Sequence, residues 1–155
     1  MGSVIYEIRR ICKAEGCTVL LINDDEEDYS ILATDYIPNS KIKRVTQFPG
    51  FYEIANSWKE MLGDAGNCIV VKDQEDMEFV SRVNHPWYLT LVEAGVRSVV
   101  LFPLRQGNEL LGFIWVVNFE TKETMRIKET LELTTFFVSS HIARYKVLKR
   151  LHSMG

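Results

Sequence analysis

The chain has 155 residues, of which 46% are hydrophobic, and 18 Lys or Arg against 21 Asp or Glu give a formal net charge of -3. This length suits one ordinary globular domain, and the apolar content excludes an intrinsically disordered chain. The mildly acidic charge, without a basic block, argues against nucleic acid or an anionic membrane as the main partner, and no apolar run is long enough to cross a bilayer. We therefore expect residues 1–155 to form a single cytoplasmic domain.

The three cysteines, Cys12, Cys17 and Cys68, form no C-x-x-C pair. Neither a disulfide framework nor a zinc site is therefore indicated. Each cysteine lies in or next to an apolar segment, so we expect three reduced thiols that pack as small hydrophobic side chains.

The first elements along the chain are a helix and a hairpin. Apolar residues recur at helical spacing over residues 4–12, and Gly16 ends this segment. The continuous apolar run at 17–23 predicts a strand that is buried on both faces, and a second strand over 29–37 makes an antiparallel hairpin with it. The acidic residues 24–28 lack the alternating ligands and central glycine of a calcium loop, so they predict a solvated turn.

The middle of the chain predicts two helices and a strand. A helix over 49–62 begins at a proline and ends at Gly63, and residues 67–72 predict a strand. Residues 73–80 predict only a short capped turn. A second helix begins at Asn-His-Pro and spans 84–95.

The strongest strand patterns are at 97–104 and 110–118, joined by a tight hairpin, and Gly112 inside the second strand indicates close approach of another backbone or a bulge. A long helix over 123–152 ends the pattern. Antiparallel hairpins separated by helices predict an α+β fold. We expect a central antiparallel sheet of five to six strands, with the terminal helices on one face and the crossover helices on the other.

The terminal helix carries more apolar surface than one sheet face can cover. Leu131, Val138 and Tyr145 lie seven residues apart. A second apolar line contains Leu133, Phe136, Phe137, Val147 and Leu151. A helix of roughly 30 residues is about 45 Å long, so we expect its last part to project beyond the sheet.

Residues 142–155 are therefore predicted to begin an outgoing signalling helix of a longer polypeptide, which pairs with a second copy or with the N-terminal helix. The alternative is a long amphipathic helix that packs only on its own domain. The residues expected at a homodimer contact are Ile5, Ile8, Ile142, Tyr145, Leu148 and Leu151.

Two segments in the second half carry a family resemblance. The stretch LVEAGVRSVVLFPL at 91–104, followed by Gly107 and LLGFIWVVN at 110–118, resembles the most recognisable part of GAF domains. That family typically shows a helix ending in Ala-Gly, an Arg-Ser strand running to Pro-Leu, a glycine turn, and a strand with a central glycine. The first helix, the first hairpin and the terminal helix also fit. The resemblance implies a regulatory module with a six-stranded antiparallel sheet, a pocket under the crossover helices, and terminal helices that usually form a parallel dimer.

A narrower resemblance concerns the output. The helix with Trp58, the IVVKD strand ending at Asp73, and HPWY at 85–88 are similar to GAF modules that precede bacterial GGDEF domains. In those proteins a helix ending like residues 148–154 leads directly into the cyclase. The resemblance therefore implies a covalently linked diguanylate cyclase as the output domain.

The main enzymatic alternative is the free methionine sulfoxide reductase branch of the same fold. That branch uses cysteines near the pocket and carboxylates on the two central strands to hold the amine of the substrate. Val99, Trp115 and Val117 stand here where the carboxylates are expected. Desolvating an ammonium group against these side chains is unfavourable, so we predict no catalytic activity.

No cofactor pattern is reproduced. Residues 119–122 do not match the signature of cyclic-nucleotide-binding GAF domains, and His85 lacks the neighbouring cysteine that is usual in bilin-binding members. His85, His141 and His152 lie on different elements, so no metal site is predicted, and Ser98 has no adjacent His or Asp pattern for nucleophilic catalysis. We predict no haem, bilin or metal.

The aromatic residues suggest two alternatives: they line a cavity for a flat or apolar ligand, or they fill the core. A ligand would contact side chains of the two central strands and lid residues from the helices. The candidate ligand-binding residues are Trp58, Trp87, Tyr88, Val99, Leu101, Trp115 and Val117. We expect a non-catalytic sensory domain that acts through small-ligand binding and dimerisation. A ligand-free structural dimeriser, a redox enzyme and the sensor of a transcription factor are the alternatives.

Overall fold

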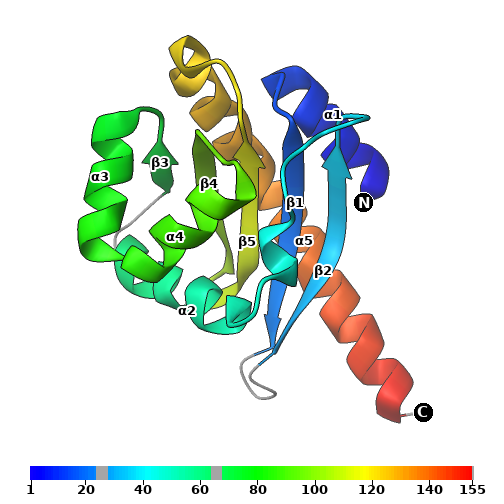
Figure 1. Ribbon diagram of the computed structural model, residues 1–155. Coiled ribbons are helices and arrows are strands. Elements are labelled where there is room, and N and C mark those ends of the chain that lie inside the picture. Colours follow the sequence, from blue (N-terminus) through cyan, green and yellow to red (C-terminus); the bar gives the residue numbers. More distant parts are fainter. Residues whose placement is uncertain (24–27, 64–67, 155) are drawn as a thin grey trace.

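The computed structural model describes residues 1–23, 28–63 and 68–154, so most of the predicted acidic turn lies outside the described residues. A five-stranded sheet of order β2-β1-β5-β4-β3 forms the middle layer of the molecule (Figure 1). The elements are, in chain order, α1 (Gly2–Cys12), β1 (Gly16–Asn23), β2 (Asp28–Tyr36), η2 (Val45–Gln47), α2 (Phe51–Leu62), β3 (Ile69–Val71), α3 (Gln74–Val83), α4 (His85–Ala94), β4 (Val99–Gln106), β5 (Glu109–Val117), η3 (Thr121–Glu123) and α5 (Thr124–Met154).

All strand pairs of the sheet are antiparallel, which confirms the predicted α+β class with five strands. Strand β1 lies between β2 and β5, and its residues 16–22 are all buried, as its continuous apolar run predicts. The β4–β5 hairpin turns at Gly107, whose φ of 59° suits a residue without a side chain.

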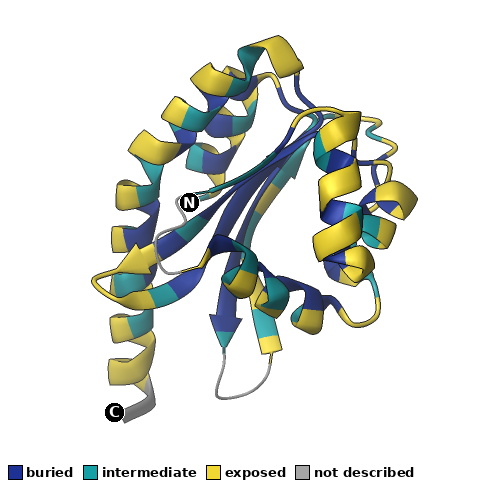
Figure 2. Cartoon of the chain, turned by 90° about the vertical axis from the view of Figure 1, so that its left-hand side faces the viewer, coloured by how far each residue is buried: buried dark blue, intermediate teal, exposed yellow. Residues whose placement is uncertain are grey.

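Successive side chains of β4 and β5 point to opposite faces, and both faces are apolar. Val100, Phe102, Ile114 and Val116 belong to the core with α1 and α5. Val99, Leu101, Trp115 and Val117 belong to the core with α2 and α4. The sheet is therefore buried between the terminal helices and the crossover helices, as Figure 2 shows.

Helix α3 is longer than the short turn that its sequence predicts. The carboxylate of Asp73 accepts a hydrogen bond from the backbone N–H of Asp76 at 2.9 Å, which caps the first turn. Met77 and Val80, three residues apart, form the buried side of this helix. The cap and this pair together mark a helix longer than a single turn.

The two ends of α5 have different surroundings. Ile127, Leu131 and Val138 pack against the sheet, whereas residues 147–152 are exposed (Figure 2). The helix therefore continues past the sheet after its buried part ends.

Three residues expected at a dimer contact lie inside this chain's own core. Ile5 and Ile8 of α1 and Ile142 of α5 are at most 3% exposed and pack with the strands. A second copy cannot contact these side chains without unpacking the domain, which corrects that part of the expected interface.

Gly112 is predicted to be irreplaceable because a Cβ at this position would lie 1.8 Å from the carbonyl oxygen of Leu20. Gly112→Ala is expected to lower the free energy of unfolding by about 3 kcal/mol or more, measured by urea denaturation. Gly2→Ala is the control, because no atom lies within 4 Å of that Cβ. Equal stability of both variants would contradict the close approach of β1 and β5.

Candidate functional site

An aromatic layer lies between the sheet and the crossover helices, with Trp58 of α2 at its centre. The ring centroid of Trp58 is 5.6 Å from Trp87, 5.1 Å from Phe113, 5.4 Å from Trp115 and 5.8 Å from Phe51, all in edge-to-face geometry. Each such pair contributes about 0.5–1.5 kcal/mol beyond its buried area. Trp58 therefore links α2, α4 and β5 in one rigid contact.

The sequences of α2 and α4 turn these rings toward the sheet. Ile54, Trp58 and Leu62 recur at helical spacing and form the buried side of α2. Asn84 caps α4, because its side-chain oxygen accepts from the backbone N–H of Trp87 at 3.4 Å. Its amide also donates to the hydroxyl of Ser57 at 2.8 Å, so Asn84 joins the two crossover helices.

Residues 37–48, here named the strap, connect β2 to α2 across the remaining side of the layer. The backbone N–H of Lys43 donates to the carbonyl of Ala94 at 2.9 Å, and the hydroxyl of Tyr29 donates to the carbonyl of Thr46. The guanidinium of Arg44 lies 3.6 Å from the ring centroid of Tyr36, a cation–π contact. These contacts hold the strap over the aromatic layer.

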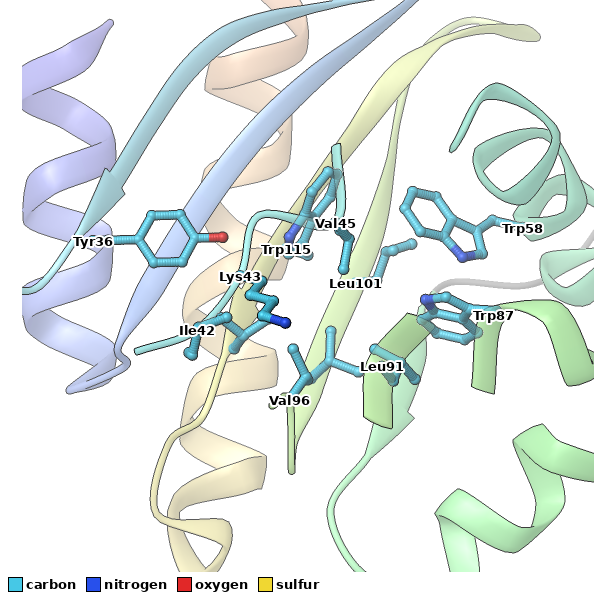
Figure 3. A pocket seen from close by; sticks show the side chains of 12 residues that line it. Tyr36, Ile42, Lys43, Val45, Trp58, Trp87, Leu91, Val96, Leu101 and Trp115 are labelled. Atoms are coloured by element: carbon cyan, nitrogen blue, oxygen red, sulfur yellow. The ribbon is translucent and has the colours of Figure 1, made fainter. Parts of the chain in front are cut away.

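A cavity of about 10 Å³ remains under the strap (Figure 3). This volume is about the space of a single water molecule. Its lining residues are Tyr36, Ile42, Lys43, Val45, Trp58, Trp87, Leu91, Val96, Val99, Leu101, Trp115 and Val117. The aromatic side chains therefore almost close the cavity.

Most of the candidate ligand-binding residues come together at this cavity. Trp58, Trp87, Val99, Leu101, Trp115 and Val117 line it. Tyr88 does not, and it stacks instead on His85 with ring centroids 5.8 Å apart. Tyr36, Ile42, Lys43 and Val45 also line the cavity and were not predicted. Tyr36 ends β2, and the other three lie on the strap, whose path is not encoded in a repeating pattern.

The lining of the cavity is mostly apolar. Lys43 is the only charged residue among the lining side chains, and no acidic residue or cysteine is present there. The indole Nε1 of Trp58 is buried and has no hydrogen-bond partner among the described residues. Trp58 therefore contributes one unused donor to an apolar wall, and the lining residues include no carboxylate pair and no cysteine.

The surroundings of the three cysteines lower the reactivity of their thiols. Burial raises the pKa of Cys12 to about 11 and raises the pKa of Cys17 further. Partial burial also raises the pKa of Cys68. Because the thiolate is the reactive form, these shifts disfavour thiol chemistry near neutral pH. Across the described residues, no group of three or more His, Cys, Asp or Glu side chains could hold a metal ion.

The fold and this site define a GAF domain. The GAF domain family matches residues 3–142, and the chain belongs to that family. A comparison with curated proteins gives no match.

Several solved structures share the fold. GAF3 from Slr1393 of Synechocystis sp. PCC6803, solved in its photoproduct state, is 12% identical with a TM-score of 0.64, over 96% of this chain and 94% of that chain. The GAF domain of a Coxiella burnetii phosphoenolpyruvate-protein phosphotransferase is 15% identical with a TM-score of 0.62, over 96% and 83%. The chromophore-binding domain of Stigmatella aurantiaca phytochrome P1 is 13% identical with a TM-score of 0.65, over 90% and 52%.

The name of the Stigmatella aurantiaca structure describes a chromophore-binding domain. No cysteine lines the cavity of this chain, and its volume is about 10 Å³. His85 lies elsewhere, in a surface cleft with Met61 and Phe79. Among the described helices, none combines the length and apolar content that a membrane span needs.

Chemical labelling of the three thiols tests the effect of burial on their reactivity. With a chromogenic disulfide reagent near pH 8, Cys68 is expected to react first, because it is the most exposed of the three. Cys12, whose pKa is about 11, carries about one thiolate per thousand molecules under these conditions. Cys12 and Cys17 should therefore react only after unfolding.

A Cys68→Ser variant is the control for this experiment, and it should show no rapid reaction in the folded state. Rapid labelling of this variant without denaturant would mean that a thiol in the terminal-helix core is accessible and activated.

Proposed function

We propose that this GAF domain is a non-catalytic regulatory module that works as a parallel homodimer and passes a signal along α5 to an output domain. GAF domains are in general sensory modules. The observation that carries the proposal is an apolar strip on the outer side of α5. Leu133 is 80% exposed, Phe136 is 81% exposed and Leu151 is 59% exposed.

The strip, defined as residues 133, 136, 137, 140, 144, 147, 148 and 151, has the spacing of a helix–helix seam. Positions 133, 137, 140, 144, 147 and 151 alternate in steps of four and three, as the core positions of a coiled coil do. The opposite side of α5, with Leu131 and Val138, packs on the sheet. Exposed apolar residues at both ends of the strip, 133–137 and 147–151, favour protein association.

The strip also contains most of the predicted contact residues that stay accessible. Leu148 and Leu151 are each 59% exposed, and Tyr145 lies beside the strip. Arg144 is exposed inside the seam. In a parallel pair the two Arg144 side chains face each other, which weakens association and leaves the helix pair adjustable. Such a pair can shift between two arrangements when the domain changes state.

We further propose that the output domain is a diguanylate cyclase of a bacterial signalling protein, and that the module works in the cytoplasm. The support is the resemblance carried by the Trp58 helix, the strand ending at Asp73 and the segment 85–88. In this proposal, residues 142–155 begin the helix through which the pair acts on the cyclase.

A second candidate function is small-ligand sensing by the cavity. It is favoured by the buried Nε1 of Trp58, which lacks a partner among the described residues, because buried donors are seldom left unsatisfied. Since the cavity is nearly closed, a ligand would have to displace the strap, and binding would favour a different state of the domain. Native mass spectrometry of gently purified protein tests for a retained molecule.

The dimer is tested with Leu133→Glu and Leu151→Glu. Each variant places a charge in the strip, and each is expected to convert a dimer at micromolar concentration into a folded monomer, measured by light scattering after size exclusion. Lys146→Glu is the control, because this residue lies on the opposite side of the helix. A wild-type monomer, or equal effects of all three substitutions, would contradict the proposed seam.

Arg144→Leu tests whether the two facing Arg144 side chains weaken the proposed dimer. Replacing the two facing guanidinium groups with apolar side chains should lower the dimer dissociation constant by about tenfold or more. Sedimentation equilibrium measures this change. A weaker dimer would mean that Arg144 makes a favourable contact across the interface, in conflict with a parallel pairing.

A further inference from the structure

We infer that the cavity under the strap takes a small aromatic carboxylate. Its ring would lie among the indoles, its carboxylate at Lys43 and a neutral acceptor at the Nε1 of Trp58. This inference rests on the ligand sensing proposed above as the second function, and it names the class of ligand.

The apolar wall selects the body of the ligand. Trp58, Trp87 and Trp115 supply indole surfaces, and the other lining side chains of β4 and β5 are Val99, Leu101 and Val117. Aromatic rings gain edge-to-face and offset contacts with indoles in addition to buried area. A flat aromatic ring therefore suits this wall better than a sugar or a polar nucleotide base.

The strap side of the cavity selects an anion. The amino group of Lys43 is the only charge in the lining, and Lys43 forms no ion pair with any described residue. Figure 3 shows the hydroxyl of Tyr36 and the amino group of Lys43 on the side of the cavity away from Trp58 and Trp87. Lys43 is solvent-exposed, so a carboxylate there keeps part of its hydration and gains a charge-assisted hydrogen bond.

The inner end of the cavity selects a neutral acceptor. Trp58 is 1% exposed, and its Nε1 has no partner among the described residues. Figure 3 shows its nitrogen edge turned toward the ring of Trp87, so a ligand reaches this N–H only when one of the two indoles shifts. A carboxylate placed this deep would lose its hydration for one hydrogen bond, whereas a phenol oxygen accepts the bond at little cost.

Entry of such a ligand requires movement, because a cavity that holds benzene has a volume of about 150 Å³ and this cavity has about 10 Å³. The strap is the covering element that contains no long helix or strand. It is held by the Lys43–Ala94 hydrogen bond, the Tyr29–Thr46 hydrogen bond and the Arg44–Tyr36 contact. Displacement of the strap opens the cavity and carries Ile42 out of the core with α2 and α4, while the sheet and the core with α1 and α5 stay in place.

The test uses three probes on the purified full chain, and binding is followed by isothermal titration calorimetry and tryptophan fluorescence. 4-Hydroxyphenylacetate carries both the anion and the inner acceptor, phenylacetate lacks the acceptor, and 4-hydroxyphenylacetamide lacks the charge. The hydroxy acid is expected to bind about tenfold more tightly than either analogue, because phenylacetate loses the hydrogen bond at Trp58 and the amide loses the charge assistance at Lys43.

Two variants assign the groups. Lys43→Gln should remove the preference for the acid over the amide, and Lys41→Gln, on the same strap but outside the lining, should keep it. Trp58→Phe retains an aromatic ring without the N–H, so it should remove the preference for the hydroxy acid over phenylacetate. Tyr88→Phe is the matched control outside the cavity.

The outcomes separate the ligand class from the sensing function. Equal binding of the acid and the amide, or preferences that survive Lys43→Gln and Trp58→Phe, would overturn the aromatic carboxylate while leaving a sensing cavity. If none of the probes binds, and neutral indole does not bind either, both the ligand class and ligand sensing fail. The proposed dimeric regulator would then act without a ligand.

Discussion

The continuous run of apolar side chains along β4 and β5, which point alternately to the two faces of the sheet, is the constraint on which the other features depend. Both faces of these strands are apolar, so each face requires a layer of helices to cover it. The crossover helices place Trp58 and Trp87 on one face, and α1 and α5 cover the other. Because Gly112 has no side chain, β1 can approach β5 closely enough to complete the sheet. The arrangement leaves an apolar interior with a small cavity on one side of the sheet and an exposed apolar strip on α5.

The two sides of α5 have different surroundings. Leu131 and Val138 pack the helix on the sheet, and the strip on the other side remains exposed. In the proposed dimer, a change in the sheet or in its aromatic layer would move the surface through which the second copy pairs. The strap lies over the opposite face of the same strands, so displacement of the strap and movement of α5 can be coupled through β4 and β5.

Strongly periodic elements were predictable from the sequence. The helix faces that pack on the sheet and the path of the strap were not. The buried run of β1, the Gly63 cap of α2 and the close approach at Gly112 all follow from local residue chemistry. Apolar spacing alone does not say which side of α1 and α5 faces their own sheet, so Ile5, Ile8 and Ile142 were expected at a dimer contact. The strap residues were missed because a loop's path depends on distant contacts, such as the Lys43–Ala94 hydrogen bond.

Cysteine cross-linking within the strip tests the central claim most directly, because a disulfide forms only when two Cα atoms approach to about 4.4–6.8 Å. In a Cys68→Ser background, Ser140→Cys places a thiol in the seam, and Lys146→Cys places one on the opposite side of α5. The account predicts that mild oxidation converts Ser140→Cys into a covalent dimer and leaves Lys146→Cys monomeric under denaturing conditions. No cross-link at residue 140, or an equally fast one at residue 146, would contradict pairing through this face of α5.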